Sequence, residues 1–223
     1  MQQIPLNIAL DQDNTFASFL MGKNQFLMEF LLQASRSGNE FVYLWGNQGS
    51  GKSHLLQAFG NQSESVIYIP LKEPGLAPEM LEGLESFQIV CIDDIDAIAG
   101  DAKWEEGIFH LYNRIKDIGN SLVISGNQSP NDIGISLNDL KSRLTAMTVF
   151  KIQMLSDTDK QVLLQQKAAA MGFTLGSEVA QFVLSRSSRD LHYLMKALDQ
   201  LDSASLIAQR KITVPFVKDV LGL

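Results

Sequence analysis

The chain has 223 residues, 45% of them apolar, which suits one large domain or two small ones with a real hydrophobic core. Its formal net charge of −7 does not favour non-specific binding to nucleic acid, and its single cysteine, Cys91, excludes disulfide frameworks and cysteine zinc clusters within the chain. No apolar stretch is long enough to span a membrane and no basic leader precedes an apolar run, so we expect a cytoplasmic protein with no membrane partner.

The first 15 residues are expected to form a tail ahead of the folded part of the chain. Ile4, Leu6 and Ile8 are apolar at intervals of two, and Pro5 argues against a central strand or the interior of a helix. These apolar side chains need a cover, which is either a partner protein or the chain's own domain. The residues alone leave both readings open, because termini are ordered only when something holds them.

A strand–loop–helix unit follows a first predicted helix over residues 24–35. The apolar run 41–45 predicts the strand, and apolar residues from Leu55 to Phe59 predict the helix. Between them, residues 46–53 read G-N-Q-G-S-G-K-S and fit the phosphate-binding P-loop pattern G-x-x-x-x-G-K-[ST]. Because the strand and the helix supply the context that this pattern requires, a simple glycine-rich turn is the weaker reading.

The P-loop predicts a nucleotide site that also holds Mg²⁺. Backbone N–H groups of the loop and the N-terminus of the following helix would bind phosphates. Lys52 would reach the β- and γ-phosphates, and the Ser53 hydroxyl would ligate Mg²⁺. The predicted nucleotide-binding residues of this loop are Gly46, Gly49, Ser50, Gly51, Lys52, Ser53 and His54.

Two further strands are predicted at 66–70 and 87–94, with a short helix between them at 79–84. The second of these strands is apolar until it ends in Asp93 and Asp94, as expected of a parallel strand buried on both faces. Asp93 is the predicted carboxylate ligand of Mg²⁺, and Asp94 is a candidate for orienting the attacking water. The alternative is that one or both carboxylates cap the next segment.

An amphipathic helix over 104–119 leads to a fourth predicted strand over 121–126. Asn127 follows that strand and could hydrogen-bond the γ-phosphate or the attacking water, although Asn and Gly are also ordinary turn residues. Ligands of open α/β sheets bind at the carboxyl ends of the strands. One nucleotide could therefore meet the P-loop, Asp93 and Asn127.

The remaining elements predict an α/β core followed by a helical part. A short helix over 137–144 and a fifth strand over 149–152 complete a parallel five-stranded sheet flanked by helices. After Leu155 the pattern is helical, with predicted helices over 156–171, 177–185 and 190–208 and a last one that Thr213 would cap. We expect three parts: a tail, a nucleotide-binding α/β subdomain and a C-terminal helical lid, over residues 1–15, 16–154 and 155–223.

A P-loop α/β core followed by a small helical lid resembles the AAA+ ATPase class. Over about residues 15–223 the chain resembles the bacterial replication initiator DnaA, in the segments 16–24, 46–56, 92–95, 140–144 and 212–217. DnaA continues past its lid into a helix-turn-helix domain and carries an N-terminal helicase-interacting domain. Since the chain has room for neither, we do not expect it to be the initiator itself.

Three other segments are similar to the Hda family of DnaA-related regulators, namely 104–114, 198–202 and 208–211. That resemblance implies a protein that carries ADP or ATP with Mg²⁺ and hydrolyses it weakly or not at all. With the sliding clamp of the polymerase, such a regulator stimulates ATP hydrolysis by DnaA and prevents re-initiation of chromosome replication. The family's tail binds the clamp, which implies this role for Gln3, Leu6 and Ile8 and a contact with DNA only through the clamp.

The same resemblance implies roles for two arginines. Arg143 is similar to the arginine finger that acts in trans on a neighbour's ATP, where such a group is worth roughly 10³–10⁵ in rate; otherwise it forms a surface salt bridge. Arg189 stands where the lid arginine of the family contacts the nucleotide; otherwise it pairs with Asp190 at a helix start. Asn127 stands where the family has Asp, so its polarity transfers and a charged role does not.

Two other function classes compete with this regulator. An autonomous AAA+ ATPase of the helicase-loader type would turn over ATP itself and bind single-stranded DNA, which the acidic charge disfavours. A small-molecule P-loop kinase would carry an arginine-rich lid, but Arg186, Arg189 and Arg210 are spread rather than clustered. The residues do not indicate which base is bound, whether ADP or ATP is the working ligand, or whether the chain forms a homodimer.

Overall fold

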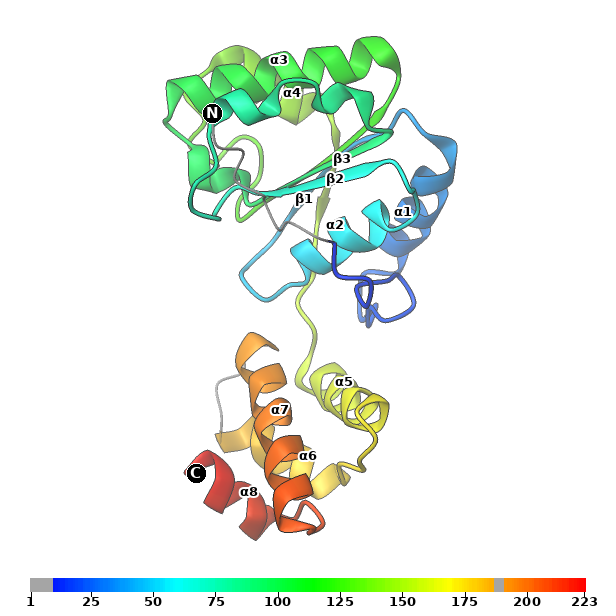
Figure 1. Cartoon of the computed structure of the whole chain (residues 1–223), viewed down its shortest axis with the longest axis vertical. Coiled ribbons are helices and arrows are strands. Elements are labelled where there is room, and N and C mark those ends of the chain that lie inside the picture. The colour runs from blue at the N-terminus through cyan, green and yellow to red at the C-terminus, as the bar shows by residue number, and fades with distance from the viewer. Residues whose placement is uncertain (1–9, 187–190) are drawn as a thin grey trace. The chain divides into compact units, whose positions relative to one another are not determined.

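The computed structural model describes residues 10–186 and 191–223 (Figure 1). Four predicted binding residues, Gln3, Leu6, Ile8 and Arg189, lie outside these ranges. The chain divides into two compact units, Met1–Gln153 and Met154–Leu223. The first is an α/β unit and the second is helical, and each is described below by itself.

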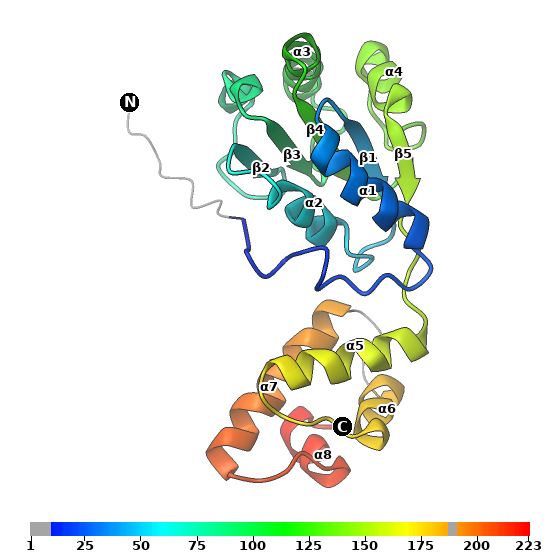
Figure 2. The ribbon, with the colours of Figure 1, turned by 90° about the vertical axis from the view of Figure 1, so that its right-hand side faces the viewer.

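The α/β unit is a five-stranded parallel sheet with helices on both faces, as predicted (Figure 2). Its strands, in the spatial order β2-β3-β4-β1-β5, are β1 (Phe41–Trp45), β2 (Val66–Pro70), β3 (Ile89–Asp93), β4 (Ser121–Gly126) and β5 (Thr148–Lys151). Its α-helices are α1 (Gln25–Ser37), α2 (Lys52–Gly60), α3 (Ala102–Ile118) and α4 (Asn138–Ala146). Three short 3₁₀ segments cover Pro78–Leu81, Leu84–Ser86 and Ile95–Ile98.

Two hydrophobic layers cover the sheet, one on each face. Leu31 of α1 and Leu56 of α2 belong to one buried cluster, while Ile108 of α3 and Leu144 of α4 belong to the other. The central strands β3 and β4 are buried throughout, because both their faces are covered. Cys91 is fully buried in β3, and burial raises the pKa of its thiol, so it is an inert core residue as predicted.

The strand order brings the carboxyl ends of β1, β4 and β3 to one edge of the sheet. Trp45 at the end of β1 pairs with Gly126 at the end of β4, and Gly46 donates its backbone N–H to the Gly126 carbonyl at 3.3 Å. Strand β3 lies on the other side of β4 and ends at Asp93. The P-loop, Asp93 and Asn127 therefore lie at the same edge of the sheet.

Two predicted elements differ from the structure for local backbone reasons. The helix expected over 79–84 is two 3₁₀ segments, because Gly83 has φ 79° and breaks the helical path. The strand expected to reach residue 94 ends at Asp93, because Asp94 adopts a left-handed conformation with φ 58°.

The second unit consists of α5 (Asp157–Ala170), α6 (Ser177–Arg186), α7 (Leu191–Ala208) and α8 (Val214–Leu221). These helices share a buried core that includes Leu164, Leu198 and Val217. Ser156 forms a capping box with Asp159, as the acidic start of α5 predicts. Thr213 is the N-cap residue of α8 as predicted, but its side chain makes no capping hydrogen bond. Among the described helices of both units, none has the length and apolar character of a membrane span.

Candidate nucleotide site

A pocket of about 570 Å³ opens at the carboxyl edge of the sheet. The P-loop supplies one wall through Gln48, Gly49 and residues 51–54, and the opposite side comes from Lys72, Asp94 and Asn127. The structure thus brings most of the predicted nucleotide site together in one pocket. Its lining combines backbone N–H groups, two lysines and a carboxylate, which suits a charged ligand more than an apolar one.

Glycines allow the P-loop to turn tightly before α2. Gly49 and Gly51 have φ 74° and 93°, in the left-handed region that glycine adopts without strain. A Cβ on Gly51 would also lie only 2.7 Å from Cε2 of Phe19. The loop therefore depends on Gly51 for both its conformation and its close packing, and it places the first turn of α2 against the pocket as a phosphate site requires.

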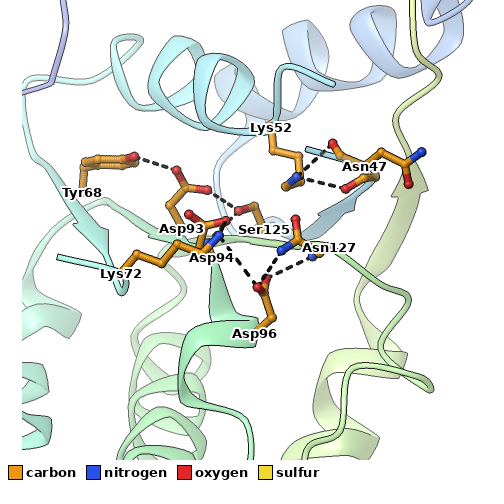
Figure 3. Close-up of polar contacts among 10 residues, drawn as sticks. Asn47, Lys52, Tyr68, Lys72, Asp93, Asp94, Asp96, Ser125 and Asn127 are labelled. Carbon is orange, nitrogen blue, oxygen red and sulfur yellow. Dashed lines mark hydrogen bonds and ion pairs between the residues drawn. The ribbon is translucent and has the colours of Figure 1, made fainter. Parts of the chain in front are cut away.

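The Lys52 side chain folds back and hydrogen-bonds the backbone of the P-loop (Figure 3). Its Nζ donates to the carbonyl oxygens of Gly46 at 2.9 Å and Asn47 at 3.2 Å, and the side chain is buried. Burial lowers the pKa of Lys52, although the nearby carboxylates, Asp94 first, act in the opposite sense. Of the described side chains, Ser50 alone has a buried hydroxyl without a hydrogen-bond partner. A phosphate fits this loop, because it would give Lys52 stronger acceptors than the two carbonyls.

Asp93 is held by hydroxyl groups from both neighbouring strands (Figure 3). The Tyr68 hydroxyl on β2 donates to its Oδ2 at 2.6 Å, and the Ser125 hydroxyl on β4 donates to its Oδ1. Burial is the main cause of the raised pKa of Tyr68, and Asp93 adds to it, so the phenol remains a donor. Each carboxylate oxygen keeps a second lone pair, and oxygen ligands are those that Mg²⁺ prefers, but Asp93 does not line the pocket that Ser53 lines. The predicted roles of Asp93 and Ser53 as Mg²⁺ ligands stay predictions.

The Asp94 side chain pairs with the Lys72 ammonium group and does not cap the next segment. It precedes the 3₁₀ segment Ile95–Ile98, but its side chain makes no capping hydrogen bond. Its backbone N–H donates to Ser125 Oγ at 2.9 Å, and its Oδ1 lies 2.8 Å from Lys72 Nζ. The capping alternative is therefore wrong for Asp94. Its predicted role in orienting water stays a prediction.

Asn127 is fixed by a carboxylate that the sequence pattern did not single out. Its backbone N–H and its Nδ2 both donate to Asp96, at 3.1 Å and 2.6 Å (Figure 3). Asp96 also lies 3.8 Å from Lys72 Nζ. The charge that Asn127 lacks is thus supplied next to it by Asp96. The third acid of the run Asp93-Asp94-Ile95-Asp96 was the signal that could have indicated this.

The segment before α1 is fastened to the P-loop helix. Asp11 donates its backbone N–H to Gln57 Oε1 at 3.0 Å, and Asn61 Nδ2 donates to the carbonyls of Asp11 and Asn14. His54 Nε2 lies 2.9 Å from the Thr15 carbonyl. His54 therefore lines the pocket as predicted and also ties the leading segment to α2.

Arg143 lies apart from the other predicted site residues. It is half-buried on α4, with its guanidinium 5.7 Å from the centre of the Tyr112 ring on α3. Helices α3 and α4 cover the face of the sheet opposite to α2. Within residues 10–186 and 191–223, no carboxylate lies close enough to pair with Arg143, so the salt-bridge alternative is not supported.

Comparisons with known proteins agree with this layout. The family model described as Bacterial DnaA ATPase domain matches residues 76–151, and the one described as Hda, lid domain, matches residues 157–221. Domain III of the Thermotoga maritima replication initiation protein DnaA is similar at TM-score 0.84 and 23% identity, covering 96% of this chain and 98% of that chain.

Two other solved structures have the same fold. AMPPCP-bound DnaA from Aquifex aeolicus gives a TM-score of 0.73 at 20% identity, covering 85% of this chain and 65% of that chain. The Thermotoga maritima RuvB Holliday junction branch migration motor gives 0.70 at 15% identity, covering 89% and 68%. At these identities the likeness shows the fold alone.

Proposed function

Because the chain is an Hda/DnaA-related AAA+ protein, we propose that it binds an adenine nucleotide and, with the sliding clamp, stimulates ATP hydrolysis by the initiator DnaA. This activity would lower the amount of ATP-bound initiator and prevent re-initiation of chromosome replication. The observation that carries the proposal is the position of Arg143. It has no carboxylate partner among the described residues and lies on the opposite face of the sheet from the P-loop helix.

Nucleotide binding is supported by the pocket and by the relatives. The P-loop, Lys72 and Asn127 enclose about 570 Å³ with cationic and backbone donor groups, which match the charge of phosphates. Solved DnaA structures contain AMPPCP, an ATP analogue. Ser53 and Asp93 would hold Mg²⁺ as hard oxygen ligands, and the ion would neutralise charge on the phosphates. Arg189 would contact the nucleotide from the lid.

Action on another protein's ATP is supported by the surroundings of Arg143. The guanidinium rests over the Tyr112 ring, and Tyr112 is itself buried between α3 and the sheet. Such support fixes the guanidinium plane without neutralising its charge. A fixed cation of this kind, presented to a neighbouring ATP, would stabilise the charge on the transferring phosphoryl group.

Clamp binding is the role we propose for Gln3, Leu6 and Ile8. The apolar side chains at 4, 6 and 8 need a cover, and a groove on a partner would supply it. Binding through a short tail would place the regulator on the clamp, and the clamp would bring it to DNA. The acidic charge of the chain then creates no conflict, because no direct contact with DNA is needed.

The test is phosphate release from ATP-loaded DnaA in the presence of clamp on DNA. We expect release to rise only when DnaA, clamp and this protein are all present, and Arg143→Ala to lose the rise while keeping MgADP binding. Phosphate release by this protein alone, with no effect on DnaA, would instead support an autonomous ATPase of the helicase-loader type. Wild-type stimulation by Arg143→Ala would place the arginine finger elsewhere.

A further inference from the structure

A buried carboxylate on α3 binds the backbone at the start of α4. Glu105 is 1% exposed and has no ion-pair partner among the described residues. Its oxygens accept hydrogen bonds from the backbone N–H groups of Gly100 and Leu137, both at 2.7 Å, and of Ser136, at 3.0 and 3.1 Å. A buried carboxylate needs such donors in place of water. Glu105 therefore joins α3 to the segment before it and to the segment that begins α4.

Helix α4 has no N-terminal capping side chain of its own. Its N-cap residue is Leu137, whose side chain cannot accept a hydrogen bond. In a capping box the third residue of the helix would bind the N-cap N–H, but in α4 that residue is Leu140. Glu105 binds the Leu137 N–H instead, together with the Ser136 N–H before it. The start of α4 is thus capped by a side chain from a different helix.

The hydrogen bonds of Glu105 are directional, whereas the apolar contacts of α4 are not. Leu140 and Leu144 are fully buried in the cluster that covers this face of the sheet. Apolar burial has no preferred direction, so it holds the helix against the core without fixing where its first turn lies. Hydrogen bonds weaken steeply when their angles are lost, so Glu105 fixes the position of that turn.

Arg143 lies on the same helix, six residues after the capped Leu137. At 1.5 Å of rise per residue this is about 9 Å along the axis, less than two turns. The Arg143 guanidinium also lies 5.7 Å from the centre of the Tyr112 ring, and Tyr112 belongs to α3 as Glu105 does. Helix α3 thus contacts α4 at its start and in its last turn. A shift of the start of α4 would therefore move Arg143 relative to Tyr112.

We propose that Glu105 is a positioning residue that fixes α4, and through it Arg143, in the geometry needed to act on a neighbour's ATP. The inference rests on the proposed role of Arg143. An arginine finger stabilises charge on the transferring phosphoryl group only where the guanidinium is correctly placed, and a displacement of about 1 Å can cost roughly 10²-fold in rate. Glu105 does not line the nucleotide pocket, so its replacement should leave MgADP binding intact.

The first measurement is phosphate release from ATP-loaded DnaA, with clamp on DNA, as the concentration of this protein is raised. Glu105→Gln keeps the length of the side chain but replaces one accepting oxygen by an NH₂ group, which cannot accept a backbone N–H. The maximal rate should fall by roughly 10²-fold. The concentration that gives half of that rate, and MgADP affinity in calorimetry, should stay nearly unchanged, which a general loss of structure would not allow.

Glu85→Gln is the matched control. Glu85 also binds α3, through a 3.0 Å contact with Arg114, but this ion pair joins α3 to the 3₁₀ segment Leu84–Ser86 and not to α4. The two variants remove the same charge and both weaken a contact of α3, yet Glu85→Gln should stimulate DnaA like the wild type. Glu105→Asp keeps the charge and shortens the side chain by one methylene group. It should also lower the maximal rate, and it provides a second test if Glu105→Gln does not fold.

The second measurement is the side-chain Nε–H signal of Arg143 in NMR spectra of the MgADP-loaded chain, which needs no DnaA. The ring current of Tyr112 shifts this signal, and Arg143→Ala identifies it by its disappearance. The signal should move in Glu105→Gln and stay in place in Glu85→Gln.

The two measurements separate the failure of this inference from the failure of the proposed function. An unmoved Arg143 signal in Glu105→Gln, or a maximal rate equal to that of the wild type, would overturn the inference and keep the proposed function. A wild-type chain that did not stimulate DnaA would remove the proposed function, and the role of Glu105 with it, even if the signal moved.

Discussion

Removing the Tyr68 hydroxyl should destabilise the α/β unit by about 2 kcal/mol. Tyr68→Phe keeps the ring in its place on β2 and deletes the hydroxyl that donates the 2.6 Å hydrogen bond to Asp93 Oδ2. Tyr68 is 8% exposed and Asp93 is 2% exposed, so water cannot replace the lost donor. Hydrogen bonds to charged groups contribute about 1.5–3 kcal/mol, and the buried carboxylate oxygen loses one of its partners.

Tyr43→Phe provides a matched comparison within the same sheet. The Tyr43 hydroxyl donates to the neutral carbonyl of Gln128 at 3.0 Å, and the side chain is fully buried. Loss of a hydrogen bond between neutral groups costs about 0.5–1.5 kcal/mol. The two variants therefore remove the same atom and differ in the charge of the acceptor.

Urea unfolding followed by tryptophan fluorescence is the assay. The two tryptophans, Trp45 and Trp104, both belong to the first unit, so their signal reports that unit and not the helical one. A loss of about 2 kcal/mol should also lower the melting temperature by about 4–8 °C for a unit of this size. A cost below about 0.5 kcal/mol, or one no larger than that of Tyr43→Phe, would refute the argument that Asp93 depends on this hydroxyl.

Three further variants test the proposed site and surfaces. Lys52→Met should abolish MgADP binding in calorimetry and leave the circular dichroism spectrum unchanged, because the apolar stem is kept; retained affinity would contradict the P-loop assignment. Arg143→Ala should reduce stimulation of DnaA by roughly 10³-fold or more without changing MgADP affinity. Phosphate release by DnaA measures this, and stimulation at the wild-type level would mean that a different residue acts. Replacing Gln3 and Leu6 by Ala should abolish clamp binding in surface plasmon resonance; undiminished binding would place the clamp site elsewhere.

The main features of the site were predictable because they follow from local patterns. The P-loop is one continuous octapeptide. Asp93 can be recognised from the strand that it ends, without knowledge of any other part of the chain. Both depend on residues close together in the sequence, as does the strand that precedes Asn127. The five-stranded sheet follows from the same alternation of strands and helices.

The partners of these residues were not predictable, because they depend on strand order. Tyr68 and Ser125 meet at Asp93 only because β2 and β4 flank β3. In the sequence, Tyr68 is one aromatic residue in an apolar run, and nothing local marks its hydroxyl. Lys72 and Asp96 are likewise ordinary charged residues until the order of the strands brings Lys72 Nζ within 3.8 Å of Asp96 Oδ2. Arg143 gained its proposed role from the family resemblance and not from its spacing.

The hydrogen bonds between the leading segment and α2 set the length of a tether. Asp11 is fixed to Gln57, and Gln3 lies eight residues before it, so the chain between them can span at most about 29 Å. A clamp held at Gln3 would therefore stay within that distance of the P-loop helix, at a local concentration on the order of millimolar. Loading the nucleotide site and meeting an initiator would then take place beside the clamp, even when the bulk concentration of the regulator is low.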